Sequence, residues 1–176
     1  MKKEDIIIRL KKSTQSILRL VEDDKFNRFF IAPKGKWSVS EHIDHLLRSI
    51  QPLNKALRIP LPGLRILFGK AGNPPRDFDQ IKHEYQNAIE KGAKAKGRYI
   101  PIKKGSKEVL LKNYMKQSEA LVKIINLWKD KDLDQYMLPH PFLGKLIIRE
   151  MLYFSIYHTE IHGKRIEELI ALEATN

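Results

Sequence analysis

Hydrophobic residues recur at helical spacing in four long stretches of this sequence. The first stretch covers residues 5–22 and the second covers 38–57, each with apolar side chains every three or four positions. The third covers 106–128, and the fourth begins after Gly144 and ends at about Leu172. Nowhere does the chain alternate polar and apolar residues in the way that indicates a strand. The pattern therefore predicts an all-α protein built around four long helices.

A capping sequence marks the start of the second helix. Ser38 and Glu41 stand three residues apart, so the serine hydroxyl can accept from a free backbone N–H while the glutamate reaches back. Trp37 comes just before, where an apolar residue can pack against the first turn. Further along, Pro52 predicts either a kink or an early end of this helix.

Residues 60–105 differ from the rest of the chain, because they contain six of the nine glycines and five of the nine prolines. One short helix is predicted within them, over 78–90, and the remainder is expected to be irregular. The apolar run 61–68 could form an interface, a lid over a pocket or part of the core. A long crossover between the second and third helices of a four-helix bundle would account for the whole segment.

Length and composition agree with one soluble domain. A chain of 176 residues suits a single core, so residues 1–176 are expected to form one domain. The absence of cysteine excludes disulfides, thiolate nucleophiles and cysteine-ligated metal sites. No apolar run approaches the ~20 residues of a membrane span, and the first residues do not resemble a signal peptide. We therefore expect a cytoplasmic protein with no membrane partner.

The net charge is strongly positive, at +12. Much of the excess lies in residues 91–112, where eight basic residues stand against Glu108 alone. Such an excess can indicate nucleic acid, an acidic membrane surface or an anionic substrate. Only Tyr99 supplies an aromatic ring in this segment, and the sequence contains no nucleic-acid-binding motif. We therefore interpret residues 91–112 as a solvated loop and do not expect nucleic acid as a partner.

Two histidines of the fourth helix are the strongest candidates for chemistry. His158 and His162 are four residues apart, which places both side chains on one helix face with Cβ atoms ~5–6 Å apart. That face is the apolar one, and two imidazoles at this spacing can bind one divalent metal ion. The simpler alternative is a pair of buried neutral histidines that find hydrogen bonds. We favour the metal, because burying two polar rings without a partner is costly.

A third ligand should come from another helix, since bundle interiors build metal sites from facing helices. His42 and His45 of the second helix are the candidates, and His42 lies nearer the apolar stripe. Periodicity does not decide between them, because a helix with two neighbours can use a second face. Glu41 is assigned to the helix cap. His83 is expected on the polar side of its helix, and His140 is expected in a loop.

Two sets of motifs resemble one protein family. Residues 37–46, Trp-Ser-Val-Ser-Glu-His-Ile-Asp-His-Leu, are similar to the W-S-x-x-E-x-x-x-H-L opening of the second helix in the DinB/YfiT-like superfamily. The sequences His-Pro-Phe-Leu-Gly at 140–144 and His-Thr-Glu-Ile-His at 158–162 resemble its last-helix pattern, H-P-x-x-G followed by H-x-x-x-H. The order of the motifs and the long second connection extend the resemblance over nearly the whole chain.

The resemblance implies a four-helix bundle with up-down-down-up topology and a long crossover between helices 2 and 3. It also implies a homodimer and a divalent metal ion, often nickel or zinc, held by three histidines. Transferred onto the matching positions, the ligands are His45, His158 and His162. The family pattern thus selects His45, and His42 stays as the alternative.

Three neutral imidazoles would leave the ion with open positions, which is the arrangement of a catalytic site. The resemblance therefore implies a metal-dependent enzyme, either a hydrolase or a transferase that uses a low-molecular-weight thiol, acting on a small-molecule substrate. No catalytic residue is assigned besides the metal ligands. The alternatives are a non-catalytic module, for stress response or for binding anions or nucleic acid through residues 91–112, and a metal that serves stability alone.

Overall fold

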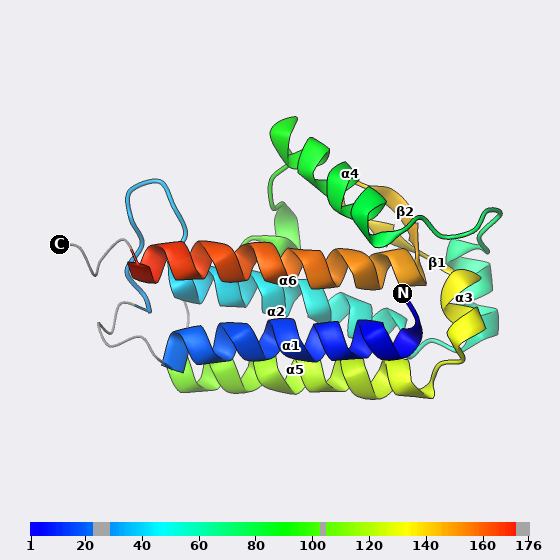
Figure 1. Ribbon diagram of the computed structural model, residues 1–176, viewed down its shortest axis with the longest axis horizontal. Helices are drawn as coiled ribbons and strands as arrows, with labels where there is room; N and C mark the ends of the chain where they lie inside the picture. The colour runs from blue at the N-terminus through cyan, green and yellow to red at the C-terminus, as the bar shows by residue number, and fades with distance from the viewer. Residues whose placement is uncertain (23–28, 103–104, 172–176) are drawn as a thin grey trace.

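Four long helices form a bundle in the computed structural model, which describes residues 1–22, 29–102 and 105–171 (Figure 1). Each forms where the hydrophobic periodicity predicts it, within two or three residues at either end. The predicted end of the last helix, Leu172, lies outside the described residues. The four helices are α1 (Lys3–Glu22), α2 (Val39–Ala56), α5 (Lys107–Leu127) and α6 (Ile148–Ala171).

The helices follow an up-down-down-up course, as the resemblance implied. α1 and α6 run in one direction, and α2 and α5 run in the other (Figure 1). Arg9 near the start of α1 pairs with Glu160 of α6 at 2.9 Å, whereas Lys3 donates to the carbonyl of Trp128, beyond the end of α5. α1 and α2 each pack against both α5 and α6. Since α2 and α5 are parallel neighbours, a long connection must return the chain to the end where it started.

That connection contains two helices, α3 (Leu61–Phe68) and α4 (Phe78–Glu90), and a short 3-10 turn, η1 (Gly97–Tyr99). α4 has the predicted bounds and packs on the outside of α6 (Figure 1). The sequence analysis did not predict α3 as a helix. Its apolar run contributes Leu64 to the core but leaves Ile66 and Leu67 largely exposed.

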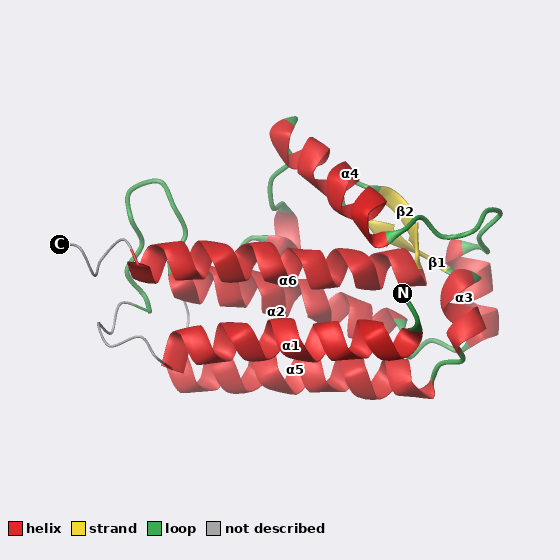
Figure 2. Ribbon diagram, viewed as in Figure 1, coloured by secondary structure: helices red, strands yellow, loops and turns green. Residues whose placement is uncertain are grey.

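A small hairpin precedes α6 and corrects the expectation that the chain has no strand. It consists of β1 (Met137–His140) and β2 (Gly144–Ile147), which pair antiparallel (Figure 2). Gly144 has φ +72°, a conformation that favours glycine and that closes the turn. Strands of four residues are too short to show an alternating pattern, so periodicity misses them. α6 therefore begins at Ile148, after the second strand.

The predicted cap at the start of α2 is present. Ser38 and Glu41 form both hydrogen bonds of the capping box. Pro52 does not end the helix, which continues to Ala56.

No helix among the described residues is long and apolar enough to cross a membrane.

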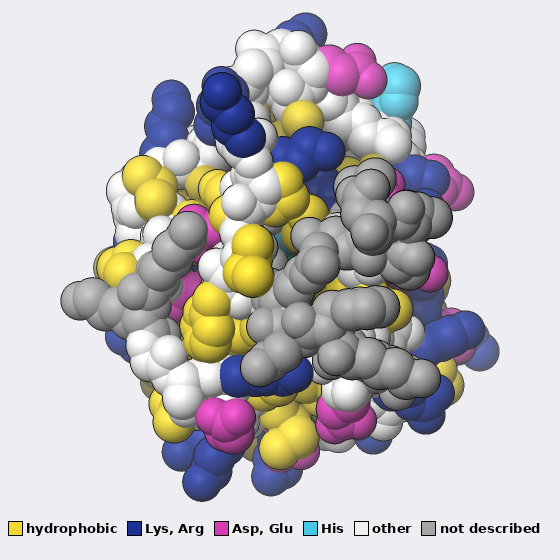
Figure 3. Space-filling model, turned by 90° about the vertical axis from the view of Figure 1, so that its left-hand side faces the viewer, with side chains coloured by type: hydrophobic (Ala, Val, Ile, Leu, Met, Phe, Trp, Pro, Cys, Tyr) yellow, Lys and Arg dark blue, Asp and Glu magenta, His cyan; other side chains and the backbone are white. Residues whose placement is uncertain are grey.

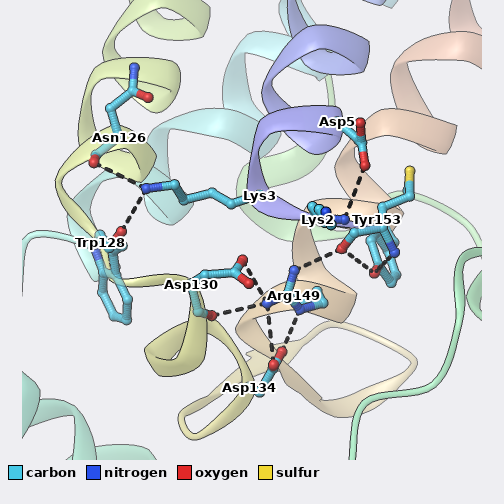
Figure 4. Close-up of polar contacts among 10 residues, drawn as sticks. Lys2, Lys3, Asp5, Asn126, Trp128, Asp130, Asp134, Arg149 and Tyr153 are labelled. Atoms are coloured by element: carbon cyan, nitrogen blue, oxygen red, sulfur yellow. Dashed lines mark hydrogen bonds and ion pairs between the residues drawn. The ribbon is translucent and has the colours of Figure 1, made fainter.

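Buried Arg149 ties the start of α6 to the segment that follows α5 (Figure 4). Its guanidinium contacts the carboxylates of Asp130 and Asp134 in the 3-10 turn η2 (Asp130–Asp134), and it also donates to the carbonyl of Met1 at 2.9 Å. Burial acts to lower the pKa of Arg149, but the hydrogen bonds to the two carboxylates raise it above its usual value. The cation is therefore retained in the interior, where an unpaired charge would be costly.

A second buried ion pair ties the crossover to α6. Arg76, just before α4, donates to Glu150 from its backbone N–H and from its side chain, at 2.8–2.9 Å. Glu150 is 2% exposed and also accepts from the backbone of Ile147. The other side of the Arg76 guanidinium reaches Glu84 of α4. Arg76 thus connects α4 to the first turn of α6.

Glu150→Gln tests this connection. The substitution leaves Arg76 without its buried carboxylate, so we expect the free energy of unfolding in urea to fall by about 2 kcal/mol, the range for hydrogen bonds to charged groups. The matched control is Glu84→Gln, because the Glu84 side chain is 40% exposed and should contribute less than about 1 kcal/mol. Equal losses in the two variants would show that the buried contact has no special importance.

Candidate metal centre

Three buried histidines meet between α2 and α6. One ring nitrogen from each of His45, His158 and His162 lies within 4.8 Å of the others. The three side chains are between 2% and 8% exposed. The structure therefore brings together the three residues that the family resemblance selected.

The antiparallel packing of α2 against α6 produces this meeting. His158 and His162 stand one turn apart with ring centroids separated by 4.6 Å, and the centroid of His45 lies 4.9 Å from each of them. Residues 42–47 are all buried, so α2 has no solvent face at this level. A helix enclosed on all sides has no single apolar stripe, which explains why periodicity could not choose between His42 and His45.

The spacing of the nitrogen atoms suits a shared metal ion. Nε2 of His45 lies 3.0 Å from Nε2 of His158. Two imidazole nitrogens bound to one ion at ~2.0–2.1 Å lie about 2.9 Å apart at a right angle and about 3.4 Å apart at a tetrahedral angle. On the other side of the His45 ring, Nδ1 donates to the carbonyl of Tyr99 at 2.6 Å. That bond places the proton on Nδ1 and leaves Nε2 free to act as a ligand.

His42 joins the site as a hydrogen-bond partner of a candidate ligand. Its Nδ1 lies 2.8 Å from Nδ1 of His162. One of these two nitrogens carries the shared proton. Nε2 of His162 is free to bind a metal in the tautomer in which His162 Nδ1 carries that proton and donates to His42. His42 itself is outside the group of converging ligand atoms. The geometry therefore gives His42 a supporting position rather than the place of His45.

Trp37 covers this cluster from the side of the preceding loop. Its ring centroid lies 5.0 Å from that of His45 and 5.5 Å from that of His42, and the indole stacks on His162 at 6.0 Å. The sequence indicated only a helix-entry role for this tryptophan. Its contact with the histidines arises because α6 passes the first turn of α2.

The electrostatic environment keeps the rings neutral. Burial lowers the pKa of His158 and of His162 well below the usual value, and the neighbouring histidines lower it further. Burial also lowers the pKa of His42 to about 4, and it lowers that of His45. At neutral pH the rings are therefore imidazoles with free lone pairs, which is the form that binds metal.

The sequence analysis missed two further residues at the site. Tyr99 holds His45 through its backbone carbonyl, which no side-chain pattern could reveal. His140 was expected in a loop, but it ends β1, is buried, and packs against Phe154 with ring centroids 4.3 Å apart. Its Nδ1 accepts from the backbone N–H of Leu143 at 3.1 Å. His83, by contrast, is exposed on α4, as expected.

A cavity of about 290 Å³ opens beside the histidines. His45 and His158 form part of its wall, and His140 forms another part. The remaining lining residues come from α2, the crossover, the hairpin and α6. A buried group of three neutral nitrogen ligands next to a cavity of this size can hold a metal ion and present it to a small molecule.

A four-helix bundle with this topology and a buried three-histidine group defines the class of protein. The chain belongs to the DinB superfamily, whose family model matches residues 8–166. The matched segment includes all three histidines and both sets of motifs. No curated protein sequence matches the chain.

Several solved structures share the fold. YfiT from Bacillus subtilis, described as a probable metal-dependent hydrolase with an unusual four-helix bundle topology, has a TM-score of 0.63 and 16% identity, over 95% of this chain and 85% of that chain. TT2238, a four-helix bundle protein, has a TM-score of 0.61 and 16% identity, over 94% and 98% of the two chains. At this level of identity the similarity establishes the fold and not the activity.

A third similar structure is ClbS, a colibactin self-resistance protein determined in complex with double-stranded DNA. Its TM-score is 0.53 at 16% identity, over 96% of this chain and 95% of that chain. The DNA belongs to the ClbS complex, and at this identity the similarity again establishes the fold alone.

His140→Asn provides a test of the buried neutral histidine at the cavity. Burial lowers the pKa of His140 to about 4, whereas in the unfolded chain the ring has its usual pKa of 6.5. The unfolded state therefore binds a proton first as the pH falls, and the wild type loses about 3 kcal/mol of stability from this group between pH 7 and pH 4. Asparagine can accept the same turn hydrogen bond and does not titrate.

We therefore expect the free energy of unfolding of the wild type, relative to that of His140→Asn, to fall by about 3 kcal/mol between pH 7 and pH 4. Urea unfolding of both proteins at pH 7 and at pH 4 measures it. The other buried histidines are present in both proteins, so the comparison reports mainly on His140. A difference that is the same at both pH values would contradict the assignment of His140 as a neutral buried ring.

Proposed function

We propose that this protein is a metal-dependent enzyme in which His45, His158 and His162 hold one divalent ion, nickel or zinc, at the wall of the cavity. The proposed reaction is attack on a small-molecule substrate by water or by a low-molecular-weight thiol. The observation that carries the proposal is the convergence of three buried, neutral ring nitrogens beside a cavity of about 290 Å³.

The number of ligands favours catalysis over a purely structural metal. Among the residues that the structure describes, the converging group has three members, whereas structural zinc sites have four. When bound, the ion would lower the pKa of water towards ~7, or polarise a carbonyl group or thiol, as a Lewis acid. Both reactions need an open position, which three protein ligands allow.

The chain's own residues orient the ligands and shape the surroundings. The carbonyl of Tyr99 holds the His45 proton on Nδ1, and His42 engages Nδ1 of His162. Phe154 stacks on His158 with ring centroids 4.9 Å apart. Burial raises the pKa of Tyr85, which also lines the cavity, to about 12, so its hydroxyl stays protonated and can donate to a substrate oxygen.

The choice between hydrolase and thiol transferase rests on the nucleophile. The chain has no cysteine, so any thiol must come from a small molecule. The description of YfiT as a probable metal-dependent hydrolase supports the hydrolytic alternative for this chain. Assays of the metal-loaded protein on ester, amide and lactone substrates, and on electrophiles with added thiol, separate the two.

The homodimer and the single domain over residues 1–176 stay predictions. The mass of the protein in solution tests the homodimer, and limited proteolysis tests the single domain.

Metal content tests the ligand set directly. Protein purified without added metal is expected to carry a single divalent ion per chain by elemental analysis, and alanine at His45, His158 or His162 should abolish it. His83→Ala is the matched control, because His83 is exposed on α4. Loss of one ligand removes a bond to the ion, whereas the control changes only the surface.

His42→Ala tests whether His42 orients the ligand His162 or binds the ion itself. Because His42 contacts His162 and not the ion, its loss should weaken metal affinity about 10–100-fold without abolishing binding. Complete loss of the ion in this variant, with retention in His45→Ala, would exchange the roles of the two residues. Unchanged metal content in His158→Ala together with His162→Ala would refute the site.

A second candidate function is binding of double-stranded DNA, favoured by the ClbS complex and by the net charge of +12. The distribution of charge argues against it. Lys107, within the basic segment, turns back to donate to the carbonyl of Val21. On the end of the molecule drawn in Figure 3, Lys and Arg side chains are scattered among apolar and acidic ones rather than gathered in one patch.

We expect only weak, non-specific DNA binding that disappears at about 0.15 M salt, because unpatterned positive charge acts through counterion release. Fluorescence anisotropy with a short random-sequence duplex across a salt series measures it. Binding that persists at this salt concentration, and that weakens when Lys94, Lys96 and Arg98 are changed to glutamine, would establish the second candidate.

A further inference from the structure

The cavity beside the histidines has walls suited to an apolar molecule. They are formed by side chains from α2, α4, α6 and the hairpin, which surround the space with aliphatic and aromatic groups. At about 290 Å³ the cavity is at the small end of the range for ligand pockets, about 300–1,000 Å³. The aromatic members of the wall are Phe68, Tyr85, Tyr99, Phe142 and Phe154.

The charged residues of this cavity all have one sign. Lys94, Lys96 and Arg98 line it, and all three are exposed, so they lie at its solvent side. None of the described lining residues is Asp or Glu. An entrance with three cations and no carboxylate attracts anions and repels cations.

Hydrogen bonds hold this basic segment against α2. Arg48 donates to the carbonyl of Arg98 at 3.3 Å, and Asp44 accepts from the backbone N–H of Ile102 at 2.7 Å. Asp44 is itself paired with Arg48 at 2.6 Å, so its charge is compensated on α2. Arg98 is also the residue before Tyr99, whose carbonyl orients His45. The cationic entrance and the residue that orients the candidate ligand His45 are thus adjacent in the same held segment.

Besides His45 and His158, two polar residues of the cavity wall are donors. His140 accepts at Nδ1 from the hairpin turn, so its neutral ring carries the proton on Nε2. The hydroxyl of Tyr85 stays protonated, because burial raises its pKa to about 12. Donors at the wall and cations at the entrance together favour a ligand that offers hydrogen-bond acceptors.

We infer that the cavity binds a small organic anion: an apolar, aromatic-sized body against the walls, and a carboxylate or sulfonate group at Lys94, Lys96 and Arg98. This inference rests on the proposed function, because it names the substrate class of the same site. It concerns binding by the protein's own walls and cations, so it does not require a metal to be present.

Isothermal titration of metal-free protein with two probes tests the inference. Naphthoate carries the aromatic body and the acidic group, and naphthalenemethanol has the same ring system without the charge. We expect naphthoate to bind at least about tenfold more tightly, since each exposed ion pair contributes little and three act together. Raising the salt concentration should weaken naphthoate binding and leave naphthalenemethanol binding unchanged.

Charge-removing variants locate the anion. K94Q/K96Q/R98Q should weaken naphthoate binding about tenfold and change naphthalenemethanol binding less than twofold. The matched control is R19Q/K112Q/K116Q, which removes the same charge from exposed residues of α1 and α5 that do not line the cavity. The control should bind both probes as the wild type does. Ala56→Phe, which fills the cavity from α2, should abolish binding of both probes, with circular dichroism confirming the fold.

Three results would overturn the inference: equal affinity for the two probes, equal loss in the basic variant and its control, or binding of neither probe. None of these depends on metal content, which is measured separately on the same wild-type protein. Failure of the metal proposal would appear as absent metal with anion selectivity intact. Failure of the present inference would appear as bound metal with no preference for the anion.

Discussion

The structure depends on the close approach of two imidazoles from different helices, with Nε2 of His45 only 3.0 Å from Nε2 of His158. Two ring nitrogens at this distance need a shared proton or a shared cation between them, because their lone pairs would otherwise repel each other. The surrounding groups leave Nε2 of His45 as the acceptor, so either the N–H of a neutral His158 or the ion that we propose can lie between the two atoms. The carbonyl of Tyr99 places the His45 proton on the far nitrogen, and burial lowers the pKa of both rings.

The bundle topology explains why a cavity lies next to this cluster. α2 and α5 are parallel neighbours, so the chain between them must travel back along the molecule, and it does so over the outside of α6 (Figure 1). That crossover supplies α4 and the segment around η1 as walls. Arg76 fastens it to the start of α6 through buried Glu150. A connection demanded by topology therefore also encloses the candidate site.

The large positive charge divides into parts with different roles. Arg149 and Arg76 are paired with carboxylates and stabilise the fold. Lys107 is turned towards the end of α1. A small set of cations, at residues 94–98, lies at the entrance of the cavity. Net charge alone could not distinguish these uses, because it takes no account of which cations have partners.

The sequence by itself determined the four long helices, the bounds of α4, the capping box at Ser38 and the inward pair His158 and His162, because each depends on spacing within one segment. It missed the hairpin, whose strands are too short for a pattern, and α3, whose apolar residues are divided between the core and the surface. Periodicity could not choose between His45 and His42, because the two lie on a stretch of α2 that is buried all round. The family resemblance selected His45, and the tertiary structure brings it to that pair and gives His42 its place beside His162. The backbone contact of Tyr99, the burial of His140 and the cavity between them likewise depend on segments far apart in the chain, whose contacts no local pattern records.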